Sequence, residues 1–385
     1  MVRIVVNTVS VKKGSGGAFQ IALNFLRATL QPTAGVEWAY WTSADVDADV
    51  GHLFAGLRGR RYFVFPTQPD FLGSYHRVRR QIRALEARLH PDVVYSVSSP
   101  CYVRFRSPEV MRFANAWVTN PTEQAWASLS LRQRVRMHLY RLVQRHLLRR
   151  ARYVVTQTET VRRGLLDLTH LPPSHVGVVP NVLPQAFHEI DPAPLAREEA
   201  TQDVACVAAP VPHKNIAIIP GVLRALRQTA PQLRFRFHVT IPGGHPLWAA
   251  MQAELRADGL EGAVVNHGFC TQRQLADIYR TCRFCFLPSH LETFSASSLE
   301  GMYFGLFIVA SDYAFHHDVI GPAGLYFPPG DAVGAARQIA EIAQSELVQD
   351  TLRQQMKEQL ARFSDYRQSF EATVAYLKAV GQHEI

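Results

Sequence analysis

The sequence predicts an α/β protein with two parallel sheets, each covered by helices on both faces. Its 385 residues exceed what one ordinary hydrophobic core accommodates, and 47% of them are hydrophobic. Short apolar runs alternate with longer segments of helical periodicity, which is typical of doubly wound parallel sheets. The strand, loop and helix pattern of the amino terminus returns after a segment rich in proline at 180–194. Two domains of similar architecture are therefore expected.

The first domain is expected over residues 1–184. A strand at 2–6 leads through a glycine-containing loop at 14–17 into a helix with one apolar face. A second helix is expected at about 74–89. Further apolar runs predict strands at 36–41, 62–65, 92–97, 110–114 and 176–179.

Residues 131–152 are expected to form a basic amphipathic helix. Apolar residues recur at helical spacing, and arginines occupy another, narrow face. The apolar residues are Leu131, Val135, Leu139 and Leu142, and the arginines are Arg134, Arg141, Arg145 and Arg152. The helix at 74–89 carries a second cluster, Arg77, Arg79, Arg80 and Arg83.

The formal charge of +9 at pH 7 points to an anionic partner. Contact of the arginines with an anionic membrane is one interpretation, and a solvated arginine face is the other. Nucleic acid is not expected, because no recognised binding motif is present. The chain has no apolar run of 18 residues, and it begins with a strand. These features predict a cytoplasmic protein, with attachment at the inner face of the cytoplasmic membrane as the alternative.

The second domain is expected over residues 185–365. Its apolar runs predict strands at 204–209, 235–241, 264–266, 284–287 and 306–310. Cys282 and Cys285 form a single C-x-x-C that leads into one of these runs, so core cysteines are expected rather than a metal site. A last helix is expected in the tail at 366–385.

The strongest chemical signal lies between Pro288 and Asp312. Glu292 and Glu300 stand with seven residues between them, and the serines from Ser295 onward suit a helix entrance. Glu292 is then expected in a loop at the carboxyl end of a strand, with Glu300 inside the following helix, where open α/β sheets bind ligands. The helix amino end would receive a phosphate, and a carboxylate can accept hydrogen bonds from sugar hydroxyls. Binding of a nucleotide sugar is therefore expected.

The stretch Glu292-Thr-Phe-Ser-Ala-Ser-Ser-Leu-Glu300 resembles the E-x7-E region of retaining glycosyltransferases of family 4. Those enzymes have the GT-B fold, in which two Rossmann-like domains face a cleft and the last helix returns to the first domain. The commoner form of the family's motif is E-G-F-G-x-P-x-x-E, and this chain differs from it at Thr293, Ser295 and Ser297. The segments Gly321–Gly324 and Pro329–Asp331 extend the resemblance.

The resemblance implies transfer of a hexose from a nucleotide diphosphate sugar, such as a GDP-linked one, to a hydroxyl of a glycan or lipid-linked glycan. The resemblance also implies that the anomeric configuration is retained and that neither a cofactor nor a metal is needed. It further implies a role in bacterial surface polysaccharide or lipopolysaccharide synthesis. Two alternatives stay open. One is a GT-B sugar-nucleotide epimerase, and the other is a non-catalytic homologue that binds a partner protein.

The resemblance also implies roles for single residues. Lys214 reaches the diphosphate without the usual arginine, whose place Ala209 occupies. Glu292 and the backbone after it hold the donor sugar, and Glu300 holds the ribose. The implied catalytic residues are Lys214, Glu292 and Asn115. The implied donor-binding residues are Gly16, Gly17, His213, Lys214, Thr293, Phe294, Ser295, Ala296, Ser297 and Glu300.

Asn115 stands where the family often has a histidine that contacts the donor sugar. An asparagine can donate a hydrogen bond, but it cannot carry a proton near neutral pH. Either Asn115 replaces the hydrogen bond of the histidine, or the donor is a 6-deoxy sugar whose methyl group Trp117 covers.

Overall fold

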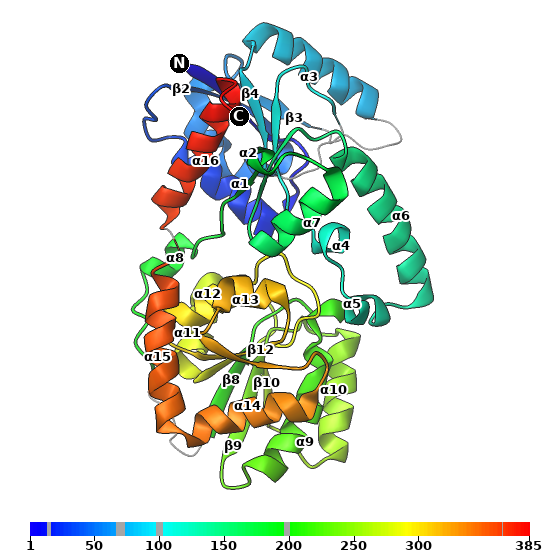
Figure 1. The fold of residues 1–385 in the computed structure, drawn as a ribbon, viewed down its shortest axis with the longest axis vertical. Coiled ribbons are helices and arrows are strands. Elements are labelled where there is room, and N and C mark those ends of the chain that lie inside the picture. The colour runs from blue at the N-terminus through cyan, green and yellow to red at the C-terminus, as the bar shows by residue number, and fades with distance from the viewer. Residues whose placement is uncertain (14–16, 67–73, 98–102, 196–200, 364) are drawn as a thin grey trace. The chain divides into compact units, whose positions relative to one another are not determined.

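The structure is a computed structural model, and it describes residues 1–13, 17–66, 74–97, 103–195, 201–363 and 365–385. Contacts divide the chain into two compact units (Figure 1). The first unit comprises Met1–Thr119, Met137–Pro180 and Arg367–Ile385, and the second comprises Asn120–Arg136 and Asn181–Tyr366. Residues 120–136 thus differ from the expected ranges. Thr122 shows why, since its hydroxyl donates a hydrogen bond to the carbonyl oxygen of His290 at 2.6 Å.

The described part of the first unit contains a parallel sheet of seven strands in the order β3-β2-β1-β4-β5-β6-β7. These are β1 Val2–Thr8, β2 Val36–Ser43, β3 Tyr62–Phe65, β4 Val93–Ser96, β5 Glu109–Arg112, β6 Tyr153–Thr156 and β7 Val176–Val178. Strand β1 is central and almost wholly buried, as expected for an apolar run covered on both faces. Strand β6 was missed, because its four residues directly follow an arginine-rich helix.

The helical segments of the first unit are α1 Gly17–Ala28, α2 Ala44–Val50, η2 Gly51–Leu57, α3 Tyr75–Leu89, α4 Ala116–Thr119, α7 Glu159–Thr169, η3 Pro173–His175 and α16 Tyr366–Gly381. Helix α16 brings Val374, Leu377 and Val380 into the hydrophobic cluster that contains β1. The Tyr153 hydroxyl also donates to the carbonyl oxygen of Ile385 at 3.0 Å. The predicted return of the last helix to the first domain is therefore confirmed.

The second unit has, within the described residues, a parallel sheet of six strands in the order β10-β9-β8-β11-β12-β13. These are β8 Thr201–Cys206, β9 Arg234–Val239, β10 Val264–Asn266, β11 Phe284–Leu287, β12 Phe307–Ser311 and β13 Gly324–Phe327. The chain runs outward from β8 in one direction and from β11 in the other. The loops after β8 and β11 therefore diverge at a switch point, where open α/β sheets bind ligands.

The helical segments of the second unit are α5 Glu123–Ala127, α8 Gln185–His188, η4 Pro212–Lys214, η5 Ile216–Ile218, α9 Ile219–Thr229, α10 Pro246–Ala257, α11 Gln272–Thr281, α12 Ala296–Tyr303, α13 Ala314–Ile320, α14 Ala332–Gln344 and α15 Glu346–Leu360. Cys282 and Cys285 are fully buried in the hydrophobic core of this unit, as predicted. The two units together confirm the predicted fold class of two doubly wound α/β domains.

Helix α6, Leu131–Leu148, is shorter than the predicted helix over 131–152. It ends before Arg152, which therefore does not belong to its arginine face. Its predicted apolar face is open to solvent, with Leu131, Val135, Leu139 and Leu142 exposed by 76, 54, 61 and 62%. The buried residues of α6 instead lie at its carboxyl end: Gln144, Leu147 and Leu148. Within the described ranges, no helix is both long and apolar enough to cross a membrane.

Candidate functional site

The candidate site lies in the second unit, where the loops after β8 and β11 meet. The first loop ends in η4 and carries His213 and Lys214, and the second carries Glu292 and leads into α12. The His290 amide donates a hydrogen bond to the carbonyl oxygen of His213 at 2.7 Å and ties the two loops together. The structure thus brings together side chains that are 78 residues apart along the chain.

Lys214 and Glu292 form a hydrogen-bonded ion pair between Nζ and Oε1. The two side chains are 22 and 10% exposed, so solvent reaches the pair only in part. The sequence predicted that Lys214 acts without the arginine of the family, and the structure adds a carboxylate partner that was not predicted. A diphosphate that enters here must share Lys214 with Glu292 or displace it.

The amino end of helix α12 begins where the sequence predicted, with Ser295 as its cap residue. In the described structure the Ser295 side chain accepts no capping hydrogen bond. Ser297 donates instead to the carbonyl oxygen of Val207 at 3.0 Å, which joins the helix start to the segment after β8. The fully buried hydroxyl of Ser298 has no hydrogen-bond partner among the described residues. The groups of the first turn that suit an anion are therefore the backbone N–H groups of the helix amino end, because the Ser298 hydroxyl is buried and the Ser297 hydroxyl is already bonded.

Three further predicted residues flank this turn, and they differ in burial. Phe294 is buried and packs edge-to-face against Phe363, with ring centroids 5.9 Å apart. Its side chain thus holds the loop on the core, which leaves only its backbone for a ligand. Thr293 is half-buried, and Ala296 is exposed at the first position of the helix.

Glu300 lies inside α12 and is buried, with 9% of its surface exposed. It accepts a hydrogen bond at 2.7 Å from the hydroxyl of Tyr279, a residue of α11 that sequence reasoning did not single out. Burial raises the pKa of Glu300, and the bond from Tyr279 acts in the opposite direction. Tyr279 thus orients the carboxylate that the resemblance assigns to the ribose.

Two imidazoles, the half-buried His213 and the fully buried His316, lie within electrostatic reach of Lys214. Burial, and then the Lys214 charge, lowers the pKa of His213 to about 4. The same two causes, in the same order, lower the pKa of His316 on α13 to about 3. His316 is fully buried, and neither ring nitrogen has a hydrogen-bond partner within the described structure. Both residues are therefore neutral at pH 7. The sequence singled out His213 as a site residue but not His316, which belongs to a different loop and helix.

The remaining predicted residues belong to the first unit. Gly17 is the first residue of α1, and Gly16 lies outside the described residues. Asn115 lies between β5 and α4, and its side-chain amide donates a hydrogen bond to the Tyr140 hydroxyl at 2.9 Å. The side chain of Asn115 is therefore already oriented by a residue of α6.

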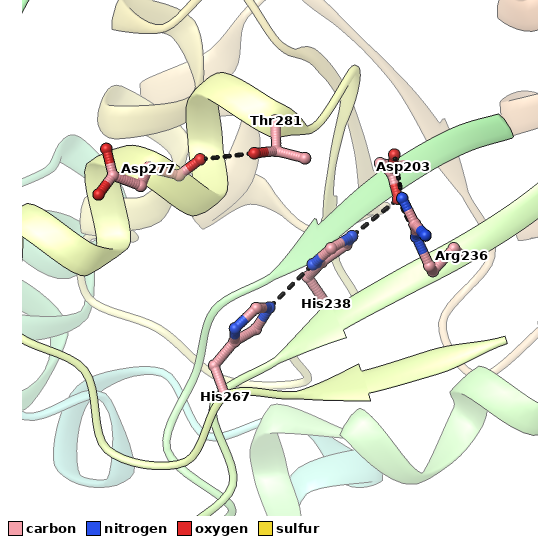
Figure 2. A network of polar contacts seen from close by, with 6 residues as sticks. All are labelled: Asp203, Arg236, His238, His267, Asp277 and Thr281. Atoms are coloured by element: carbon pink, nitrogen blue, oxygen red, sulfur yellow. Dashed lines mark hydrogen bonds and ion pairs between the residues drawn. The ribbon is translucent and has the colours of Figure 1, made fainter. Parts of the chain in front are cut away.

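A second polar network crosses the sheet of the second unit (Figure 2). Asp203 on β8 pairs with Arg236 on β9 at 2.6 Å and with the Nε2 atom of His238 at 2.8 Å. The Nδ1 atom of His238 in turn contacts the Nε2 atom of His267 at 2.8 Å. Asp203 and His238 are 3 and 5% exposed, whereas His267 reaches the surface after β10. Burial opposes ionisation of Asp203, but His238 and Arg236 outweigh it and lower its pKa.

Among the residues that the structure describes, no group of three or more His, Cys, Asp or Glu side chains is placed to hold a metal ion.

Comparison with known proteins relates the second unit to one family. Residues 202–345 match the family model described as glycosyl transferases group 1. The O-antigen chain mannosyltransferase B of Escherichia coli is 27% identical over 140 residues, which is 35% of each chain. The D-inositol 3-phosphate glycosyltransferase of Stackebrandtia nassauensis is 29% identical over 171 residues, 41% of this chain and 38% of that protein. The chain thus spans well under half the length of these curated relatives.

Solved structures are similar over nearly the whole chain. Anabaena HepE in complex with UDP and glucose gives a TM-score of 0.68 at 14% identity, covering 98% of this chain and 100% of that one. Sucrose-phosphate synthase from Thermosynechococcus elongatus gives a TM-score of 0.67 at 15% identity, and the match covers 100% of both chains. These likenesses support the GT-B class of fold, and residues 202–345 are similar to the glycosyl transferases group 1 family.

Proposed function

We propose that the protein is a retaining glycosyltransferase of family 4 that moves a hexose from a nucleotide diphosphate sugar to an acceptor hydroxyl. The observation that carries the proposal is the Lys214–Glu292 pair beside the start of α12. A cation and a helix amino end converge there at the carboxyl ends of β8 and β11. The names of the relatives support the same chemistry, since both are glycosyltransferases.

In the proposed reaction the bond between the sugar and the diphosphate breaks, and negative charge grows on the departing phosphate. Lys214 and the first turn of α12 stabilise this charge without a divalent metal. Glu292 holds the donor sugar and keeps Lys214 in place before the donor binds. Glu300, oriented by Tyr279, accepts hydrogen bonds from the ribose hydroxyls.

The purified protein tests the proposal when it is incubated with a panel of UDP- and GDP-linked sugars, with and without glycan acceptors. Release of nucleoside diphosphate and formation of an α-linked product from an α-linked donor are expected. The rate should persist in EDTA. Epimerised donor without acceptor would indicate the epimerase instead, and nucleotide binding without turnover would indicate a non-catalytic homologue.

The panel should contain GDP-mannose and GDP-rhamnose, because Asn115 replaces the histidine expected near the sugar. We propose that Asn115 contacts the C6 hydroxyl of the donor. A preference for GDP-mannose that Asn115→Ala abolishes would support this contact. A preference for GDP-rhamnose would support the 6-deoxy alternative.

We propose further that helix α6 holds the protein against the anionic inner face of the cytoplasmic membrane, where a lipid-linked acceptor of surface polysaccharide synthesis is presented. The helix contains no acidic residue, and its arginines Arg134, Arg141 and Arg145 accompany the exposed leucines. Exposed apolar side chains beside arginines match the chemistry of an anionic bilayer surface.

A further inference from the structure

A small cavity lies at the amino-terminal edge of the sheet in the first unit. Its volume is about 150 Å³, and its wall includes Arg104, Arg106, Arg150, Arg152 and Glu109. These residues lie in and beside the segments that lead into β5 and β6, two parallel neighbours in the sheet. Asn115 follows the opposite, carboxyl end of β5. The cavity is therefore separate from the predicted site residues of this unit.

The backbone on both sides of the cavity is held in place. The carboxylate of Glu86, which is 4% exposed, accepts hydrogen bonds from the amides of Arg106 and Ser107, the latter at 2.7 Å. On the other side, the Nδ1 atom of His175 contacts the carbonyl oxygen of Arg152 at 3.0 Å. Both contacts use backbone atoms of the arginines, and the side chains of Arg106 and Arg152 are exposed. The arginines are thus presented from ordered segments, which reduces the entropy that a ligand must overcome.

The charge of the cavity is strongly one-sided. Glu109 is the one carboxyl group that lines it among the described residues, and burial raises the pKa of Glu109 to about 8. At pH 7 this carboxyl group is therefore mostly protonated, whereas four arginines line the same space. The guanidinium group of Arg150 contacts the Nε2 atom of His146 at 2.6 Å. An imidazole carries no negative charge, so this contact does not neutralise Arg150. A cluster of this kind attracts anions, and the planar fork of arginine fits phosphate oxygens in pairs.

We propose that this arginine cavity binds a phosphate group, carried either by a small soluble anion or by a lipid headgroup. The volume admits one such group, and the opening between exposed arginines lets a larger molecule extend into solvent. The site goes beyond the proposed transfer reaction and does not depend on it, because it shares no residue with Lys214, Glu292 or α12.

The test compares wild-type protein with the double variant Arg106→Gln/Arg152→Gln. Inorganic phosphate and pyrophosphate are titrated by calorimetry, and phosphatidylcholine vesicles with and without phosphatidic acid are used in co-sedimentation. The matched control, Arg256→Gln/Arg337→Gln, removes two exposed arginines from α10 and α14 of the second unit. Loss of two charged hydrogen bonds should weaken binding by about tenfold or more in at least one arm, and the control should bind as wild type.

A loss in the titrations identifies a soluble phosphate as the ligand, and a loss only with phosphatidic acid identifies a headgroup. Equal binding by the double variant and the control in both arms overturns the proposal. Thermal unfolding of every variant checks the fold. If the double variant unfolds at a lower temperature than wild type, the single variant Arg152→Gln replaces it in the same comparison. This substitution keeps the backbone contact of residue 152 with His175.

Discussion

At the scale of single residues, the pair of Lys214 and Glu292 determines how an anion meets the second unit. The ammonium group is already balanced by a carboxylate, so a bound phosphate gains only the difference between two partners. This arrangement holds Lys214 in position and limits its attraction for stray anions. It also makes donor affinity sensitive to changes in either side chain.

Lys214→Ala should weaken binding of the nucleoside diphosphate by about 1 to 3 kcal/mol, because a charged hydrogen bond is lost. Calorimetric titration with UDP and GDP measures the effect. Lys357→Ala, an exposed lysine of α15, is the control with the same change of charge. Equal affinity in the two variants would remove Lys214 from the proposed site.

His316 contributes a pH dependence to stability. Its pKa lies at about 3 when folded and near 6.5 in the unfolded chain, so the unfolded state binds the extra proton between these values. The contribution of the neutral His316 to the free energy of unfolding is therefore fully present above pH 6.5 and is lost as the pH falls toward 3. His316→Leu should flatten this part of the stability curve. At pH 7 it should not lower stability, since it removes buried nitrogens without partners.

Denaturant unfolding at several pH values measures this effect, and His52→Leu in the first unit is the exposed control. A variant at position 316 with the same acid sensitivity as wild type would contradict the assignment.

At the scale of elements, the network on β8 and β9 places an ionised carboxylate inside a sheet (Figure 2). Asp203→Asn keeps the shape of the side chain but removes the charge that faces Arg236 and His238. We expect the free energy of unfolding to fall by about 1 to 3 kcal/mol at pH 7. The lowered pKa of Asp203 means that its contribution exists above its ordinary pKa and fades in acid, so the difference should shrink there.

Asp277→Asn on α11 is the matched control, because its side chain is 59% exposed and its nearest cation, Arg280, lies 3.8 Å away. Exposed pairs contribute little to stability. An equal fall in the free energy of unfolding for both variants would show that the buried network contributes no more to stability than the exposed pair.

Helix α6 presents apolar side chains to solvent over most of its length, and this exposure makes the membrane proposal testable. Leu139→Gln/Leu142→Gln should reduce co-sedimentation with anionic vesicles without loss of thermal stability, since both leucines are more than half exposed. Val333→Gln/Leu347→Gln, on α14 and α15, changes exposed apolar residues elsewhere. Unaltered vesicle binding by the α6 variant would leave α6 as a solvated surface.

At the scale of the whole molecule, the chain leaves the second unit at its end and completes the core of the first. Leu377 of α16 is fully buried in that core. Leu377→Ala should destabilise the first unit by about 2 to 5 kcal/mol through the cavity it creates. Hydrogen exchange should rise in peptides from β1 and β2 and stay low in β8 and β11. Glu371→Ala, an exposed residue of the same helix, is the control. Faster exchange confined to the second unit would contradict the arrangement.

The amino-acid sequence by itself determined the elements whose signals are local. Alternating apolar runs predicted most strands, and serines before Leu299 predicted the start of α12 to within a residue. Glu292 in a loop and Glu300 in a helix followed from the same spacing. Such features depend on neighbours within one or two turns, so they can be read along the chain.

Tertiary structure alone decided which distant groups meet. Lys214 meets Glu292 because β8 and β11 end at one edge of a sheet. Glu300 meets Tyr279 because α11 and α12 pack into the same hydrophobic core. Only the structure shows that the apolar face of α6 is open to solvent, since helical periodicity marks an apolar face but does not say what covers it. Arg104 and Arg152 gather around one cavity because β5 and β6 are neighbours, a fact that no local pattern carries. Pairing across the sheet is set by the packing of the whole core.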